Sequence, residues 1–214
     1  MACASFNKWE ALYYTDQSCE RITLEMRVTR QERLILAAIG EQSVGARSIQ
    51  ELVALRPDCR ELSISHALTL LLNGERKAAT LLERFMRDET KPGSVGRQII
   101  LTVDKNRFES RICNSLTEAM FSLDDTLGAS NKWWLQICFD CRFSREAKFV
   151  PLDDRDLLVC YRNFPDKLSQ IEQLEDSHND ISPLSDQGHF FVNAFHCCGA
   201  WKEKRSPGSN SEPP

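Results

Sequence analysis

Cysteine and histidine side chains are the residues whose spacing comes nearest to a metal site in this chain. Cys138 and Cys141 are separated by two residues, and His196, Cys197 and Cys198 follow near the end. Thiolates at this spacing, with a distant histidine and cysteine group, are the ligand types of a tetrahedral zinc site. The segment around Cys138 alternates as a strand, however, and residues three apart in a strand point to opposite faces. We therefore expect buried strand thiols, with no metal and no cofactor.

Catalytic chemistry has little support in the residue pattern. The chain contains no glycine-rich phosphate loop and no nucleophile motif that would carry a mechanism. None of its histidines stands at a catalytic spacing from an acid and a nucleophile; they are His66, His178, His189 and His196. We expect a protein that is not an enzyme. A zinc or thiol enzyme that uses Cys138, Cys141 and His196 is the alternative, because catalytic partners meet in space and not in sequence.

A group of aspartates suggests a site for a hard cation. Asp153, Asp154 and Asp156 lie together, but Arg155 stands among them and the segment joins two expected strands. A calcium-type site needs about six oxygen ligands, more than this segment supplies. A solvated turn is the interpretation that we favour.

Composition and charge limit the class of protein. The chain has 214 residues, 42% of them hydrophobic, and a formal net charge of −4, which favours one domain without a basic field. No apolar run is long enough for a secretory core or a membrane span. Nine cysteines at irregular positions are typical of reduced, buried thiols. We expect a soluble protein of the nucleus and cytoplasm that binds neither nucleic acid nor membrane.

Hydrophobic periodicity predicts the elements that would position these residues. Capping-box patterns begin at Thr29 and Ser48, and Asn73-Gly74 interrupts the longest helical pattern. The expected helices span residues 29–39, 49–55, 61–87 and 115–123. The expected strands span residues 22–28, 99–103, 108–112, 133–143, 157–161 and 190–201.

These elements predict an α+β domain, in which helices pack on a mostly antiparallel sheet. We expect a flexible N-terminus at 1–20, one domain at 21–201 with a flexible acidic connector at 166–187, and a disordered tail at 202–214. An aromatic segment after a flexible connector must dock to avoid exposing a large apolar surface. We expect this C-terminal segment to complete the sheet through Phe190, Phe191, Phe195 and Trp201.

The long helical pattern ends in LLERFMRD, and GRQIILTVDKNRFESRIC follows it. These two segments resemble the core of a HORMA domain. The resemblance implies a mostly antiparallel sheet packed against three helices, the central one long, with a hairpin and a mobile C-terminal segment that completes the sheet. Three further segments are similar to the comet-type branch of that superfamily, whose members bind the checkpoint protein Mad-two. These segments are LTEAMFSLDD, KFVPLDDRDLLVCY and HFFVNAFHCCGAW.

The resemblance implies a non-catalytic HORMA adaptor. Such an adaptor binds closed Mad-two at its dimerisation face, presents it to an AAA+ remodelling ATPase, and so silences the spindle assembly checkpoint, at the spindle or kinetochore. By position, the Mad-two contact includes Glu41, Gln42, Thr117 and Phe121, and the ATPase contact includes Arg145 and Lys148. Thr117 stands where an aromatic anchor is expected. Another HORMA protein, binding a linear peptide in a meiotic or DNA-repair assembly, is a further alternative.

Overall fold

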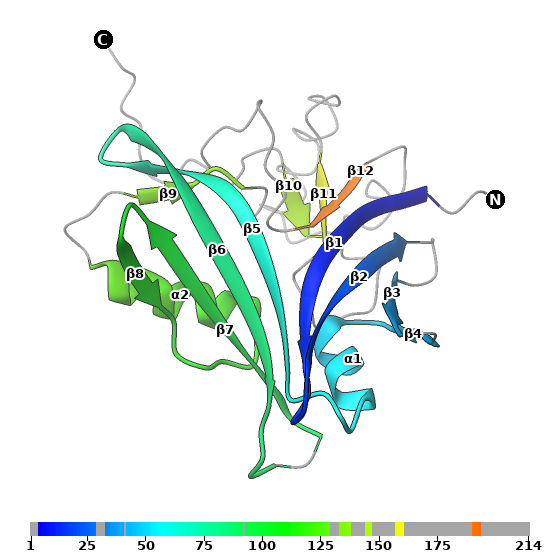
Figure 1. Cartoon of the computed structure of the whole chain (residues 1–214). Helices are drawn as coiled ribbons and strands as arrows, with labels where there is room; N and C mark the ends of the chain where they lie inside the picture. Colours follow the sequence, from blue (N-terminus) through cyan, green and yellow to red (C-terminus); the bar gives the residue numbers. More distant parts are fainter. Residues whose placement is uncertain are drawn as a thin grey trace, which may run out of the picture.

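The protein is an α+β domain built on a large antiparallel sheet (Figure 1). The computed structural model describes residues 4–28, 33–40, 42–91, 93–128, 133–137, 144–146, 157–160 and 190–193. The helices within these ranges are α1 (Ile49–Leu55) and α2 (Leu116–Leu127). The strands are β1 (Ala4–Tyr14), β2 (Cys19–Val28), β3 (Arg33–Ile39), β4 (Gln42–Ala46), β5 (Glu61–Leu72), β6 (Glu75–Arg87), β7 (Val95–Val103), β8 (Asn106–Glu109), β9 (Trp133–Leu135), β10 (Ser144–Glu146), β11 (Leu157–Cys160) and β12 (Phe190–Asn193).

The strands of the large sheet are arranged in the order β4-β3-β2-β1-β5-β6-β7-β8, and β9 also pairs with β5. β1 pairs with the first part of β5, from Glu61 to Ile64, whereas β9 pairs with its last part, from Leu70 to Leu72. The large sheet therefore forks along β5, because β1 and β9 use different parts of the same edge. β12 pairs with β11 in a separate sheet, β10-β11-β12.

The segment 61–87, predicted as a long helix, is a hairpin of β5 and β6. The two strands pair continuously from Glu61 opposite Met86 to Leu72 opposite Glu75. Asn73 and Gly74 form the turn, with φ of 50° and 87°. Positive φ at both central residues is the requirement of a type I′ two-residue hairpin turn, and Asn-Gly is a strongly favoured sequence for it. The dipeptide that we interpreted as a helix interruption is thus the hairpin's turn.

Two other predictions near the N-terminus are also wrong. Residues 33–39 of the expected helix 29–39 form β3, in which Ile35, Ala37 and Ile39 are buried at alternate positions. The expected flexible N-terminus contains β1, which pairs with β2 over its whole length. Ala11 and Tyr13 of β1 are buried, whereas Lys8 and Glu10 are exposed. Alternation with period two explains both strands.

Several local predictions are confirmed. α1 begins at Ser48, whose hydroxyl accepts from the Glu51 amide at 3.0 Å, and the Glu51 carboxylate accepts from the Arg47 amide at 2.5 Å. β7 and β8 form the predicted hairpin, although β8 ends at Glu109. β2 and β11 also occupy their predicted places. The cap at Ser48 and the turn after β7 depend on neighbouring residues, which is why these two predictions hold.

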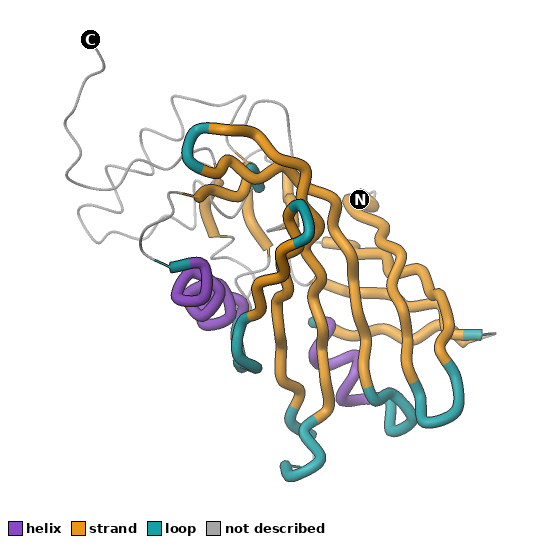
Figure 2. Tube along the Cα trace, turned by 60° about the vertical axis from the view of Figure 1, so that its left-hand side comes forward, coloured by secondary structure: helices purple, strands orange, loops and turns teal. Residues whose placement is uncertain are grey.

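The domain has two hydrophobic cores on one face of the sheet. The two helices that cover them are the purple segments in Figure 2. α1 covers the first core, which includes Leu24, Leu62 and Phe85. α2 covers the second, which includes Leu81 and Leu101. β5, β6 and β7 contribute side chains to both cores. Among the described residues, no helix has the length and apolar character needed to cross a membrane.

Candidate functional site

Helix α2 carries the predicted contact residues Thr117 and Phe121 on an amphipathic framework. Ser115 caps the helix by accepting from the Glu118 amide at 3.2 Å. Gly128, with φ of 81°, ends it as the C-cap. The side that packs on the sheet is apolar and buried; it consists of Leu116, Ala119, Met120, Leu123 and Leu127. This side fixes which residues of α2 face outward.

The outward side of α2 combines one large aromatic side chain with acidic ones. Phe121 is 67% exposed, although the helix beneath it is fully packed. Glu118 and Asp125 lie three residues before it and four residues after it, so both are its neighbours on the helix surface. Both carboxylates are exposed. Arg111 lies 4.0 Å from Asp125, but both side chains are about four-fifths exposed, and such pairs contribute little to stability.

Thr117 plays a different part from Phe121. Its side chain is half-buried, and its hydroxyl oxygen is buried without a hydrogen-bond partner among the described residues. A small, inward-turned side chain cannot insert into a partner's pocket. Of the two contact residues predicted on α2, the structure therefore presents only Phe121 as an exposed apolar anchor.

Gln42 lies at the start of β4 and not at the end of a helix. Its side-chain oxygen accepts from Arg56, just after α1, at 3.0 Å. Arg56 also binds Asp58 through two hydrogen bonds of 3.1 Å, which holds the pKa of the Asp58 carboxyl below its usual range. These groups belong to the part of the sheet covered by α1. Gln42 thus belongs to a different part of the fold from Phe121.

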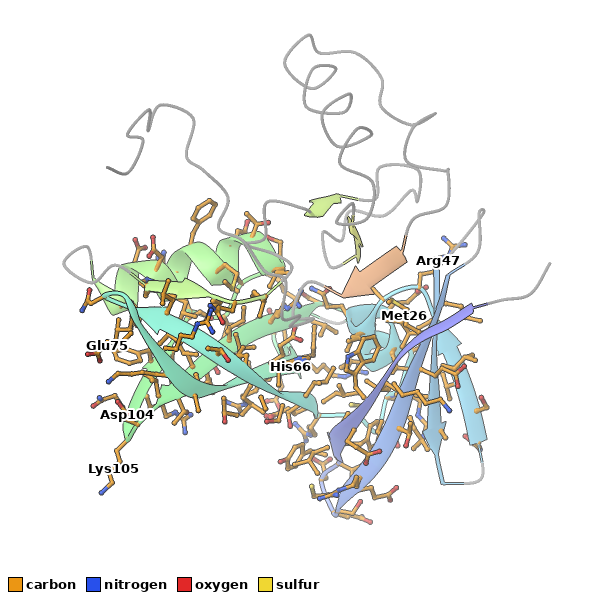
Figure 3. All side chains as sticks on the ribbon, turned by 90° about the horizontal axis from the view of Figure 1, so that it is seen from above. Met26, Arg47, His66, Glu75, Asp104 and Lys105 are labelled. Carbon is orange, nitrogen blue, oxygen red and sulfur yellow. The ribbon has the colours of Figure 1, made fainter. Side chains whose placement is uncertain are left out.

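A largely buried row of ionisable side chains separates the two hydrophobic cores. His66 of β5, Glu83 of β6 and Arg97 of β7 occupy inward-facing positions on three neighbouring strands (Figure 3, His66). Glu83 accepts from Arg97, and its second oxygen lies 2.8 Å from His66 Nε2. The Arg97 guanidinium also stacks over the Phe85 ring, 5.0 Å from its centre. Because Glu83 bridges both partners, the row is a structural charge network.

Sequence reasoning missed this row. Glu83 stands two residues from both Leu81 and Phe85, which are buried. A charged residue that alternates with the same period as the buried residues of a strand is the sequence signal that would have identified the row. The helical interpretation of this segment hid that phase.

Cys59 and Cys113 are not placed as reactive thiols. Burial raises the pKa of the Cys59 thiol to about 11, and burial also raises the pKa of Cys113. Thiols with raised pKa values carry little thiolate at neutral pH, and the thiolate is the nucleophile. Among the described residues, no group of three or more histidine, cysteine or acidic side chains could hold a metal.

Many predicted site residues lie outside the described part of the chain. Arg145 is in β10, and Phe190 and Phe191 are in β12. β12 completes the three-stranded sheet and does not extend the large one. The predicted site residues outside the described ranges are Glu41, Cys138, Cys141, Lys148, Asp153, Asp154, Asp156, His178, His189, Phe195, His196, Cys197, Cys198 and Trp201.

Comparison of this chain with protein-family models, with curated proteins and with solved structures finds no match. Function must therefore be argued from the described surface and its chemistry.

Proposed function

We propose that this protein is a non-catalytic adaptor that binds a partner protein through the outward side of α2. The observation that carries the proposal is the 67% exposure of Phe121 on a helix whose opposite side is fully buried. Exposed aromatic side chains on rigid elements are the residue type that dominates binding energy at protein interfaces. A packed helix also presents this ring with little loss of conformational freedom on binding.

The surrounding charges specify the chemistry of the partner. Glu118 and Asp125 flank Phe121 on the same side of α2. An apolar pocket with lysine or arginine at its rim would accept the ring and complement the two carboxylates. Because these carboxylates are exposed, the charge contribution should act mainly on the association rate and should weaken as salt is added.

The partner we propose is closed Mad-two, with the complex presented to an AAA+ remodelling ATPase at the spindle checkpoint. The segment LTEAMFSLDD, which forms most of α2, supports this choice by its similarity to comet-type HORMA proteins. The long central helix of that superfamily does not contribute, because residues 61–87 are a β-hairpin. The proposed Mad-two contact is therefore limited to α2, and the ATPase contact to the region of Arg145.

A binding assay with purified closed Mad-two tests this function. We expect Phe121→Ala to weaken binding by about thirtyfold, the effect of a central aromatic anchor worth about 2 kcal/mol. Leu55→Ala is the matched control, because Leu55 is 55% exposed at the end of the other helix. It should change the affinity less than twofold.

The assay tests the proposed partner and the proposed surface separately. If the unmodified chain does not bind closed Mad-two, the checkpoint function is wrong. If it binds and Phe121→Ala has no more effect than Leu55→Ala, the α2 surface is wrong. Circular dichroism of both variants should match that of the unmodified protein, because neither side chain belongs to a core.

A further inference from the structure

The free edge of strand β4 is a second surface with a definite chemistry. β4 is the outermost strand at one end of the large sheet, and among the described residues no strand pairs with it beyond β3 (Figure 1). An unpaired edge presents backbone N–H and C=O groups that another extended strand can bind. The question is which strand would fit.

The register of β3 and β4 shows which groups are available. Ile39 pairs with Gln42 across a two-residue turn, and Ala37 pairs with Val44. In an antiparallel hairpin with such a turn, the closing pair is hydrogen-bonded and the bonded pairs then alternate. Gln42 and Val44 therefore bond to β3, whereas Ser43 and Gly45 direct their N–H and C=O groups away from the sheet.

β4 lacks the devices that normally prevent edge pairing. Its sequence, QSVGA, has no charged residue and no proline, and its register with β3 is regular. The strand at the opposite end of the large sheet, β8, differs in this respect. There Arg107 and Glu109 are both exposed and form an ion pair at 2.6 Å. Charges of this kind discourage strand addition, and β4 has none.

We propose that β4 pairs with β4 of a second copy of this chain, antiparallel and centred on Val44. In this register Ser43 of each copy faces Gly45 of the other, so all the outward backbone groups of both residues are used. The side chains fit as well, because Ser43 and Gly45 are small and the two Val44 side chains meet. An isologous contact of this kind closes at two copies.

The inner face supports the same pairing. Val44 packs against the core covered by α1, and Ala46 of the same strand belongs to that core. A second β4 would continue this apolar layer across the two-fold axis. Because only five residues pair on each side, we expect a dissociation constant of about 1–100 μM, in the range of small interfaces.

Sedimentation of the full chain over this concentration range tests the proposal. The mass should rise from the 24.5 kDa of one chain toward twice that value. Ser43→Pro removes an outward N–H without removing a bond to β3, and it should raise the dissociation constant at least tenfold. Thr102→Lys is the control, because it adds a charge at an exposed position of β7, away from β4. Proline at Thr102 is avoided, since it would disrupt a strand inside the sheet.

Cross-linking tests the register itself. Val44 faces its own copy in a non-bonded pair, with Cα atoms about 4.5 Å apart, which suits a disulfide. Val44→Cys should therefore give a covalent dimer under mild oxidation. Gln42→Cys should not, because the two copies of residue 42 would be about 13 Å apart along the strands.

The two experiments leave the proposal either supported or rejected. A chain that stays monomeric at all concentrations rejects it. A dimer that persists in Ser43→Pro, or that Val44→Cys does not cross-link above the level of Gln42→Cys, also rejects it. None of these results depends on the α2 surface, since Phe121 is unchanged throughout.

Discussion

Replacing Gly74 by alanine gives opposite results for a hairpin and for a helix at residues 61–87. In the structure Gly74 has φ of 87° and nothing lies within 4 Å of an added Cβ, so the cost is purely one of backbone conformation. A non-glycine residue in this region costs about 1–2 kcal/mol. In a continuous helix the same change would instead stabilise by about 1 kcal/mol.

The expected change is large enough for a thermal melt. For a chain of this size, 1 kcal/mol corresponds to about 2–4 °C, so Gly74→Ala should lower the Tm by about 2–8 °C. Thr80→Ala provides a second comparison, because Thr80 is exposed in the middle of β6 and pairs with Thr102. It should lose up to about 1 kcal/mol in a sheet, whereas a helix would gain from alanine.

Gly128→Ala is the positive control for this experiment. Gly128 also has positive φ, at 81°, but it caps α2 and lies outside the hairpin. The control should therefore be destabilised whichever structure residues 61–87 adopt. A rise in Tm for both Gly74→Ala and Thr80→Ala, with a fall for Gly128→Ala, would refute the hairpin.

Two further predictions concern buried ionisable groups. Glu83→Gln removes the charge that faces Arg97 at a site where both side chains are 2% exposed or less, so we expect a loss of about 3–5 kcal/mol in urea unfolding. Lys77→Met breaks the exposed pair with Asp104 and should destabilise the protein far less than Glu83→Gln does, because exposed ion pairs contribute little to stability; equal losses would contradict a buried network. Burial raises the pKa of Cys59 from 9.0 to about 11. The protonated thiol therefore stabilises the folded state fully below pH 9, and this stabilisation is lost as pH rises toward 11. It amounts to at most about 2–3 kcal/mol. The free energy of unfolding in urea should be lower at pH 10.5 than at pH 8, and the difference should be smaller in Cys59→Ala. An equal difference in the two proteins would contradict the prediction.

Local signals in the sequence predicted the parts of the fold that depend on neighbouring residues. Ser48 and Glu51 gave the start of α1, and the polar residues around Asp104 gave the turn between β7 and β8. The segment 115–123 was correctly predicted as a helix, although α2 continues to Leu127. In each case the deciding contacts lie within about four residues of one another.

The long hairpin could not be read from residue preference. Its strands are rich in leucine, alanine, glutamate and arginine, which favour helices in isolation. Pairing with β1, β7 and β9 overrides that preference, and two of these partners, β1 and β9, are distant in sequence. Asn73-Gly74 was the local evidence for a turn. An Asn-Gly pair is a stronger signal for a hairpin than the apolar spacing around it is for a helix.

The candidate site shows the same limit. Periodicity placed Phe121 on a helix, but its exposure and the inward position of Thr117 depend on how α2 packs on β7 and β8. The position of Gln42 was wrong because the helix assumed before it is β3. Contacts between distant segments decide which side chains reach the surface, and a single sequence does not contain them directly.

The sharing of β5, β6 and β7 between the two cores has a consequence for unfolding. Neither core has a complete set of strands of its own. Unfolding of one core would therefore disrupt strands that the other core also needs. The domain should therefore behave as one cooperative unit, without a stable intermediate in which only one helix remains docked. Cutting the chain between α1 and β5 would accordingly release no half that folds alone.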